Sequence, residues 1–184
     1  LEENGIPFQE VPGVTSAIAV PAYGGIPVTH RDFTSSLHII TGHARAGKAL
    51  DIDFEALVRT KGTLGFLMGV SSLPAICAGL TAAGMDPDTP AAIVERGTTP
   101  GQRRVNATAA TLAQAAEEHH IESPAISIFG PVCGLADKFD WFDSLPLKGR
   151  TVVVTRPKER SGTLAPRLRA MGAQVVEYPC IETV

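Results

Sequence analysis

The sequence has few aromatic residues and no long apolar run. Phe, Trp and Tyr make up 5% of its 184 residues, whereas apolar residues of all kinds make up 44%. The scarcity of aromatics disfavours an aromatic-rich all-β fold, while the apolar fraction is large enough to form a buried core. The longest apolar runs, such as residues 17–22, are far too short to cross a bilayer, so we expect no membrane segment.

Cysteine is also scarce. Cys77, Cys133 and Cys180 are odd in number and widely spaced, which suits neither a disulfide framework nor a metal-binding cluster. We therefore expect a reducing, cytoplasmic setting and no metal site. His119 and His120 close a predicted helix, where we expect them to interact with the helix dipole rather than with a metal.

Excess positive charge is confined to the end of the chain. The formal net charge is −3, to which residues 1–36 contribute −3, residues 37–146 contribute −4 and residues 147–184 contribute +4. The change of sign coincides with Pro146 and Gly149, and we place a domain boundary there. The basic residues of the last segment are scattered and are not interleaved with aromatics, so nucleic-acid binding is not expected.

The hydrophobic periodicity predicts an α/β fold in which strands and helices alternate. Strands are predicted at residues 6–11, 37–41, 63–68, 91–95, 103–107, 124–130, 151–155 and 174–177. Helices are predicted at residues 15–25, 54–60, 73–84, 111–119 and 162–171. Thr15 or Ser16 is expected to cap the first helix, and Gly84 is expected to end the third.

Loops rich in glycine, proline and threonine lie beside several predicted strands, at residues 12–17, 24–31, 68–70 and 95–99. Strand carboxyl ends expose backbone N–H groups, and glycine lets a ligand approach the backbone closely, so together these loops predict a ligand cleft. Each loop alone is weak evidence for a ligand site, because a glycine after a strand is more often just a turn. Cationic side chains near the loops would suit a polyanionic ligand or are simply solvated: His30, Arg31, His43, Arg45, Lys48, Arg96, Arg103 and Arg104.

The loop after the strand predicted at residues 37–41 contains the pattern G-x-x-x-x-G-K, from Gly42 to Lys48. In a phosphate-binding P-loop this pattern follows a strand, as it does here. The next residue is Ala49, however, where the motif needs a hydroxyl for Mg²⁺, and the nearby Asp51 and Asp53 would repel phosphates. A P-loop-like phosphate- or nucleotide-binding protein is thus one alternative interpretation. A non-catalytic dimerisation module, in which all these loops are only turns, is another.

Six segments of the chain together resemble one enzyme family. They are VPGVTSAIAVPAYGGIPVTHRD, TGH, GTLGFLMGV, DTPAAIVERGTTPGQRRV, SPAISIFGPVCGL and DKFDWF. In their order and spacing they resemble the uroporphyrinogen-III C-methyltransferases, which are tetrapyrrole methylases, over roughly residues 1–143. The pattern GIP-x-THR with a following TGH is highly specific.

The resemblance implies two α/β domains that hold S-adenosylmethionine in the cleft between them, usually in a homodimer. The implied reaction transfers methyl groups from two S-adenosylmethionine molecules to uroporphyrinogen III and yields precorrin-2, on the route to sirohaem and cobalamin. Four positions match cofactor contacts of the family: Thr15, Ser16, Met68 and Gly97. Three others are candidates for contacts with the substrate: His30, Arg31 and His43.

Some parts of the family pattern are not matched. Its glycine-rich loop, its GDP-type loop and the residues proposed for proton transfer would all precede Leu1, so no catalytic residue is assigned. We therefore interpret the chain as truncated at its N-terminus. Residues 1–35 are expected to end an N-terminal methylase domain, and residues 36–145 to form a nearly whole C-terminal methylase domain. Leu67 stands where the family often has Tyr.

Residues 147–184 resemble the opening of a different enzyme, uroporphyrinogen-III synthase. The resemblance covers a strand, the turn Thr155-Arg156-Pro157, a helix and a second strand. We therefore expect residues 146–184 to be the first strand–helix–strand of an incomplete synthase-like domain fused to the methylase. Such a fusion is chemically sensible, because the synthase makes the substrate of the methyltransferase.

Overall fold

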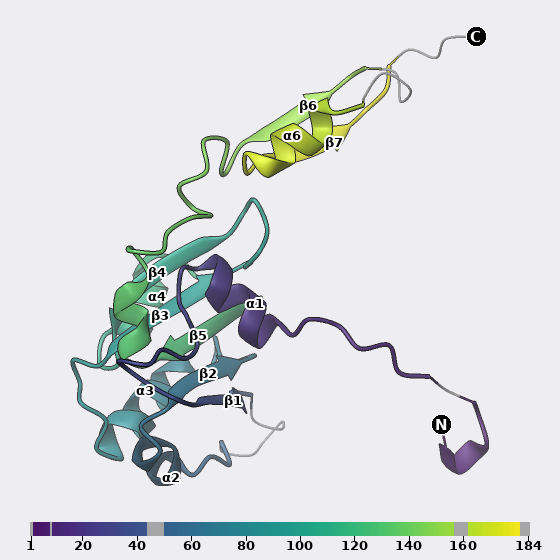
Figure 1. Ribbon diagram of the computed structural model, residues 1–184. Helices are drawn as coiled ribbons and strands as arrows, with labels where there is room; N and C mark the ends of the chain where they lie inside the picture. The colour runs from purple at the N-terminus through teal and green to yellow at the C-terminus, as the bar shows by residue number, and fades with distance from the viewer. Residues whose placement is uncertain (1, 8, 44–49, 157–161, 181–184) are drawn as a thin grey trace.

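A five-stranded sheet forms the centre of the computed structural model, which describes residues 2–7, 9–43, 50–156 and 162–180 (Figure 1). Its order is β1-β2-β5-β3-β4. The strands are β1 (Leu37–Thr41), β2 (Thr63–Leu67), β3 (Pro90–Glu95), β4 (Arg103–Thr108) and β5 (Ala125–Phe129). β1 and β2 are parallel, β5 is antiparallel to both β2 and β3, and β4 is antiparallel to β3. The carboxyl ends of β1, β2 and β3 therefore meet at one edge of the sheet, together with the start of β5.

Three helices cover one face of this sheet. They are α2 (Phe54–Arg59), α3 (Leu73–Ala82) and α4 (Leu112–Glu118). Alternate strand residues point toward them, because successive side chains of a strand lie on opposite faces. Phe66 of β2 and Phe129 of β5 are fully buried there and meet edge to face, with ring centroids 5.6 Å apart. This side holds the larger of the two core clusters.

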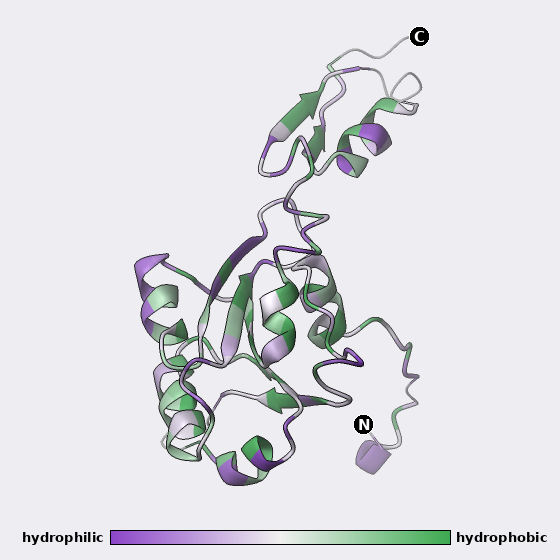
Figure 2. Cartoon of the chain, turned by 60° about the vertical axis from the view of Figure 1, so that its left-hand side comes forward, coloured by the Kyte–Doolittle hydropathy of each residue, from purple (hydrophilic) through white to green (hydrophobic). Residues whose placement is uncertain are grey.

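The opposite face is covered by α1 (Ser16–Tyr23) and by the short 3-10 helix η2 (Pro131–Leu135). Thr15 caps α1, since its hydroxyl accepts a hydrogen bond from the backbone N–H of Ala17 at 3.3 Å. Val20 of α1 then packs with Val94 of β3 and Ile126 of β5 in the second core cluster. Figure 2 shows hydrophobic residues along the central strands and on the helices that pack against them.

A separate strand–helix–strand unit follows the five-stranded sheet. β6 (Thr151–Val154) and β7 (Gln174–Glu177) pair in parallel, and α6 (Leu164–Ala170) lies between them in the sequence. The unit lies beyond one end of the larger sheet (Figure 1). It touches the preceding segment closely: a β-carbon added at Gly172 would lie 2.9 Å from Cβ of Leu145.

The α/β class is confirmed, and so are the elements predicted between residues 15 and 177, with bounds that differ by at most two residues. The strand predicted at residues 6–11 is wrong, because the described residues of this segment form no strand. Ile6 and Val11 are 50% and 83% exposed, and Pro7 has no N–H to donate to a ladder. In Figure 1 the segment runs away from the sheet and has no strand beside it among the described residues. None of the described helices is both long and apolar enough to cross a membrane.

Candidate functional site

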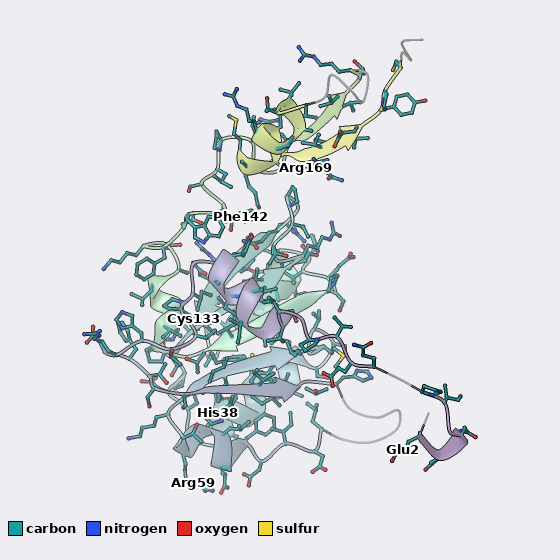
Figure 3. The ribbon with its side chains drawn as sticks, turned by 45° about the vertical axis from the view of Figure 1, so that its right-hand side comes forward. Glu2, His38, Arg59, Cys133, Phe142 and Arg169 are labelled. Atoms are coloured by element: carbon teal, nitrogen blue, oxygen red, sulfur yellow. The ribbon has the colours of Figure 1, made fainter. Side chains whose placement is uncertain are left out.

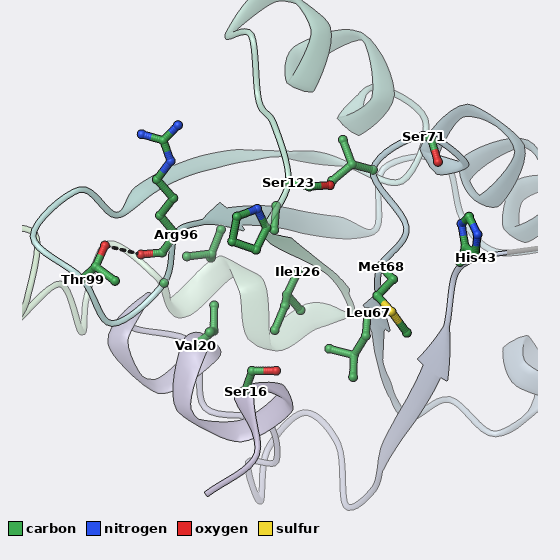
Figure 4. A pocket seen from close by; sticks show the side chains of 15 residues that line it. Ser16, Val20, His43, Leu67, Met68, Ser71, Arg96, Thr99, Ser123 and Ile126 are labelled. Carbon is green, nitrogen blue, oxygen red and sulfur yellow. Dashed lines mark hydrogen bonds between the residues drawn. The ribbon is translucent and has the colours of Figure 1, made fainter.

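A pocket of about 960 Å³ opens at the edge of the sheet where β1, β2 and β3 end (Figure 4). Its walls come from α1, from the residues after those three strands and from the start of β5. Val20, Val94 and Ile126 line it and also belong to the second core cluster, so one wall is a continuation of the core. A largely apolar concavity of this size suits a small organic ligand.

Met68 gives the pocket an exposed apolar side chain on an unusual backbone conformation. It directly follows β2 with φ 55° and is 63% exposed. Left-handed backbone costs a residue other than glycine roughly 1–2 kcal/mol, and such strain clusters at ligand sites. Figure 4 shows the Met68 side chain on the opposite side of Ile126 from Arg96. Met68 therefore lines the pocket with an exposed side chain and does not fill the core.

The loop after β3 forms another wall, and it lies directly on α1. Gly97 has Arg96 and Thr98 on either side, and both have left-handed backbone, with φ 48° and 68°. A β-carbon at Gly97 would lie 2.4 Å from Cγ1 of Val20. Only a glycine therefore allows this loop and α1 to approach as they do, and their approach brings Ser16 and Gly97 to the same pocket.

Side chains of the loop after β3 stabilise its conformation by hydrogen bonds. The hydroxyl of Thr99 donates to the carbonyl of Arg96 at 2.7 Å (Figure 4, dashed line). The backbone N–H of Thr98 donates to Oε1 of Gln102 at 2.9 Å. The Arg96 guanidinium extends away from Ser16 in Figure 4, and its Nη2 lies 4.0 Å from Oε2 of Glu122. Arg96 thus places its charge at the rim of the pocket.

Glu95, at the end of β3, is a fully buried carboxylate. It accepts a hydrogen bond from Nε of Arg103 at 2.5 Å and another from the backbone N–H of Glu122 at 3.0 Å. The hydrogen bond from Arg103 holds the pKa of Glu95 below its ordinary value, against the opposing effect of burial. This pair fixes the last residue of β3 just before the pocket loop begins.

Arg103 and Arg104 do not serve as ligand contacts in this arrangement, because the fold uses their donors. Arg103 also donates to the carbonyls of His119 and His120, at 3.1 and 2.9 Å. The Arg104 side chain is 8% exposed, and it donates to the carbonyl of Gly24 at 2.6 Å and to Asp137 at 2.7 Å. The two arginines tie α1, α4 and the segment after η2 to β4.

The structure brings four of the predicted site residues to this one pocket: Ser16, His43, Met68 and Gly97. Thr15 immediately precedes Ser16 and uses its hydroxyl to cap α1. His30 and Arg31 do not line the pocket; they lie in a turn in which the backbone of His30 pairs with that of Thr34. The His30 ring accepts a hydrogen bond from the backbone N–H of Asp32 at 3.2 Å.

Most of the Gly42–Lys48 pattern, residues 44–48, lies outside the described residues. In the described part, the backbone N–H of Gly42 is taken up by the carbonyl of Leu67, at 2.7 Å. The described residues contain no group of three or more His, Cys, Asp or Glu that could hold a metal ion. The pocket lining offers apolar contact, backbone groups, small hydroxyls and the imidazole of His43, which are groups able to bind and orient an organic ligand.

Several residues of the pocket were not predicted from the sequence, among them Val20, Ser123 and Ile126. Val20 and Ile126 carry only the signal of core residues, since they are apolar and lie on predicted elements. Ser123 reaches the pocket because β5 runs antiparallel to its two neighbours, which brings its start to the edge where they end. A turn at the beginning of a predicted strand gave no indication of this.

Comparison with known proteins relates the chain to enzymes of porphyrin biosynthesis. The "Porphyrin biosynthesis protein HemD" of Ruminiclostridium josui is 60% identical over 184 residues, which is 100% of this chain and 36% of that protein. The "Uroporphyrinogen-III C-methyltransferase" of Bacillus subtilis (strain 168) is 42% identical over 180 residues, or 97% of this chain and 37% of that protein. The chain thus spans little more than a third of the length of these relatives.

The fold also matches a solved structure. It is that of the uroporphyrin-III C-methyl transferase from Thermus thermophilus complexed with S-adenyl homocysteine, with a TM-score of 0.62 and 33% sequence identity. The match covers 73% of this chain and 57% of that one. Residues 1–113 match the family described as Tetrapyrrole (Corrin/Porphyrin) Methylases. Because this match extends over more than half of the sequence, the chain belongs to the tetrapyrrole methylase family.

Proposed function

We propose that this chain is part of an S-adenosylmethionine-dependent methyltransferase that acts on a tetrapyrrole. One observation carries the proposal: Ser16, Met68 and Gly97 come from three separate elements, match cofactor contacts by resemblance, and line one pocket. The relative from Thermus thermophilus, whose structure is that of a complex with S-adenyl homocysteine, supports the same ligand class.

The residues present fit such a cofactor. An adenosyl group needs an apolar wall, which Val20, Val94 and Ile126 provide, and hydrogen-bonding groups, which the strand-end backbone and the hydroxyls of Ser16 and Ser123 provide. When bound, S-adenosylmethionine supplies a methyl group on a sulfonium sulfur for transfer to a nucleophilic carbon. The residues of this chain would contribute by excluding water and by holding the donor in line with its acceptor, which is the main way to lower such a barrier.

We propose uroporphyrinogen III as the methyl acceptor and precorrin-2 as the product, on the route to sirohaem and cobalamin. The name of the Bacillus subtilis relative supports this substrate. His43 lines the pocket and is the best-placed candidate for a substrate carboxylate. His30 and Arg31 would contact substrate only if it extended beyond the pocket to their turn. We also propose that the working enzyme is a homodimer.

We further propose that the chain is a piece of a longer, bifunctional protein. The relatives support this, because the chain spans only 36% and 37% of them. Residues 1–35 and 36–145 would belong to the two methylase domains, and residues 146–184 would open a synthase-like domain. The separate β6–β7 sheet supports this last assignment.

The free cysteines support a cytoplasmic location. Alone, this piece should bind cofactor weakly and show no measurable turnover.

A nuclear magnetic resonance titration of the ¹⁵N-labelled chain with S-adenosylhomocysteine tests the pocket directly, because it detects even millimolar binding. We expect the amide signals of Ser16, Met68 and Gly97 to shift, and that of Ala110, in the turn after β4 at the opposite edge, to stay constant. Unchanged signals at all three pocket positions up to about 5 mM ligand would mean that any binding is weaker than about −3 kcal/mol. This result would overturn the proposal.

A second measurement separates the chain from the longer protein. The longer protein should transfer label from S-adenosylmethionine to uroporphyrinogen III, and the chain alone should not. Rapid transfer by the chain alone would contradict the proposal that part of the cofactor site lies outside it. An amide shift at Gly42 with ATP and Mg²⁺, and none with S-adenosylhomocysteine, would instead favour the phosphate-binding alternative.

A further inference from the structure

A buried glutamine lies between the pocket loop and the segment that leads to β6. Gln102 is 4% exposed. Its Oε1 accepts from the backbone N–H of Thr98 at 2.9 Å, and its Nε2 donates to the carbonyl of Tyr23 at 3.0 Å and to Oδ1 of Asp143 at 3.1 Å. Both amide hydrogens and the amide oxygen are therefore in use, which fixes the orientation of the side chain.

These hydrogen bonds connect two walls of the pocket. Thr98 lies in the left-handed turn between Gly97 and Thr99, both of which line the pocket. Tyr23 is the last residue of α1, and Ser16, the first residue of the same helix, lines the pocket as well. Because Gln102 binds the backbone of both elements, it sets where the turn lies relative to the helix.

Lys148 and Asp143 hold Gln102 from the other side. Nζ of Lys148 donates to the carbonyl of Gln102 at 2.7 Å and lies 2.8 Å from Oδ1 of Asp143. The two charged side chains are only 12% and 21% exposed, so the ion pair is shielded from water and from salt. The Lys148 ammonium also lies 5.3 Å from the centre of the Phe142 ring. These four residues form a connected polar and aromatic cluster.

The cluster lies at the junction between the five-stranded sheet and the β6–α6–β7 unit. Figure 3 shows Phe142 and Arg169 at this junction, and both line a second, smaller pocket of about 400 Å³. Next to Lys148, the backbone N–H of Leu147 donates to the carbonyl of Met171 at the end of α6, at 2.9 Å. A displacement of the unit would therefore act on Lys148 and, through it, on Gln102.

We propose that Gln102 is a positioning residue for the cofactor pocket, and that Asp143 and Lys148 orient it. In this way the segment entering the strand–helix–strand unit controls the geometry of the turn at Thr98. This inference rests on the proposed function, since the ligand is the S-adenosyl compound assigned there. It goes beyond that function because it makes the affinity of the pocket depend on residues that do not touch the ligand.

The variant Gln102→Glu in the full chain tests the proposal. A carboxylate can still accept from Thr98, but it faces the carbonyl of Tyr23 and the carboxylate of Asp143 with no hydrogen to donate. We expect S-adenosylhomocysteine to bind about tenfold more weakly, the effect of one lost hydrogen bond with its partner left unsatisfied. The Thr98 amide should also exchange its hydrogen faster. The matched control is Gln114→Glu, at an exposed glutamine that likewise donates to a carboxylate, that of Glu118.

Exchanging the two groups supplies a readout that a merely structural role would not give. In the double variant Gln102→Glu/Asp143→Asn, the amide at position 143 can donate to the carboxylate at position 102, and Lys148 still faces one negative charge. We expect the affinity for S-adenosylhomocysteine to return to within about threefold of that of the unchanged chain. The Thr98 amide should exchange its hydrogen more slowly than in the single variant Gln102→Glu. If Gln102→Glu does not fold, the variant Lys148→Met tests the proposal instead. It should bind S-adenosylhomocysteine more weakly than the unchanged chain, and its Thr98 amide should exchange hydrogen faster.

The outcomes separate the two proposals. If the unchanged chain binds S-adenosylhomocysteine and Gln102→Glu binds it equally well, the positioning role is wrong and the proposed function stands. If the double variant is as weak as the single one, the coupling through Asp143 is wrong. If the unchanged chain does not bind the ligand at all, the proposed function fails, while hydrogen exchange at Thr98 still shows whether Gln102 and Lys148 fix the turn.

Discussion

Gly97 and Val20 approach so closely that no side chain fits between them. A β-carbon at position 97 would lie 2.4 Å from Cγ1 and 2.6 Å from Cγ2 of Val20. Real β-carbons essentially never show such distances, so either the loop or α1 would have to move. Because Ser16 and Gly97 line the same pocket from these two elements, the glycine is required by packing as well as by any contact with a ligand.

The variant Gly97→Ala should therefore lower the free energy of unfolding by about 1–3 kcal/mol, the usual effect of forcing extra atoms into a packed contact. Urea denaturation measures this change. Gly101→Ala is the control in the same loop, because its β-carbon would meet nothing closer than Oγ1 of Thr99 at 3.7 Å. Equal destabilisation by the two variants would show that the contact with Val20 is not what requires a glycine.

Glu95 predicts a specific dependence of stability on pH. Its pKa is lowered in the folded chain, mainly by the hydrogen bond from Arg103. The ionised carboxylate therefore stabilises the fold above the unfolded-state pKa of about 4.3, and this contribution is lost as the pH falls through the lower folded-state pKa. Glu95→Gln should reduce the free energy of unfolding by about 2 kcal/mol near neutral pH.

Urea denaturation at several pH values between about 7 and 3 checks this prediction. The difference between Glu95→Gln and the unchanged chain should shrink as the pH falls below about 4. Glu55→Gln is the control, because Glu55 pairs with Arg59 at 3.7 Å on the exposed side of α2 and should have a small effect throughout. A difference for Glu95→Gln that stays constant with pH would mean that its ionisation is not the cause.

The three cysteines should differ sharply in reactivity. Cys133 is buried, and burial raises the pKa of its thiol to about 12. Burial also raises the pKa of Cys77, whereas Cys180 is exposed. Because the thiolate is the reacting form, a disulfide reagent near pH 8 should label only Cys180 rapidly, and Cys180→Ser should abolish this fast phase. The other two thiols should react only on unfolding. Fast labelling of a second cysteine in the folded chain would contradict this burial.

The local elements could be predicted from the sequence, because strand and helix patterns are set by neighbouring residues. Gly84 ends α3 with φ 93°, and Thr15 caps α1, as their residue types suggest. The failed strand at residues 6–11 shows the limit, because a strand exists only with a partner. The antiparallel insertion of β5 between β2 and β3 could not be seen either, since alternation along a strand reveals its two faces but not its neighbours.

The loops that hold Met68 and Gly97 were predicted to be ligand sites because they are glycine-containing turns after strands, the place where α/β folds bind ligands. The roles of these two residues as cofactor contacts came from the family resemblance, not from the loop pattern. Val20 and Ile126 were not predicted, since an apolar residue of a pocket wall has the same pattern as one in the core. Gln102 follows a glycine and precedes two arginines, which is typical of an exposed loop, and only the tertiary contacts reveal that it is buried.

Met68 gives the sharpest test of strain at the pocket. Met68→Gly relieves the strain of left-handed backbone at this position, which costs a residue other than glycine roughly 1–2 kcal/mol. This gain in stability is offset in part by the greater freedom of glycine in the unfolded chain. Since the side chain is 63% exposed, little packing is lost, and the free energy of unfolding should stay constant or rise by up to about 1 kcal/mol. The affinity for S-adenosylhomocysteine should nevertheless fall by about tenfold, because an apolar contact is lost.

Lys61→Gly is the matched control for this prediction. Lys61 also has left-handed backbone, with φ 52°, is exposed, and lies before β2 rather than after it, at the edge of the sheet opposite the pocket. Its replacement should change stability by a similar amount and leave ligand affinity unaltered, because the backbone strain is the same and only the position differs. Urea denaturation and the amide titration measure both quantities on the same samples. If Met68→Gly binds the ligand as well as Lys61→Gly does, the strained turn after β2 serves the fold and not the ligand.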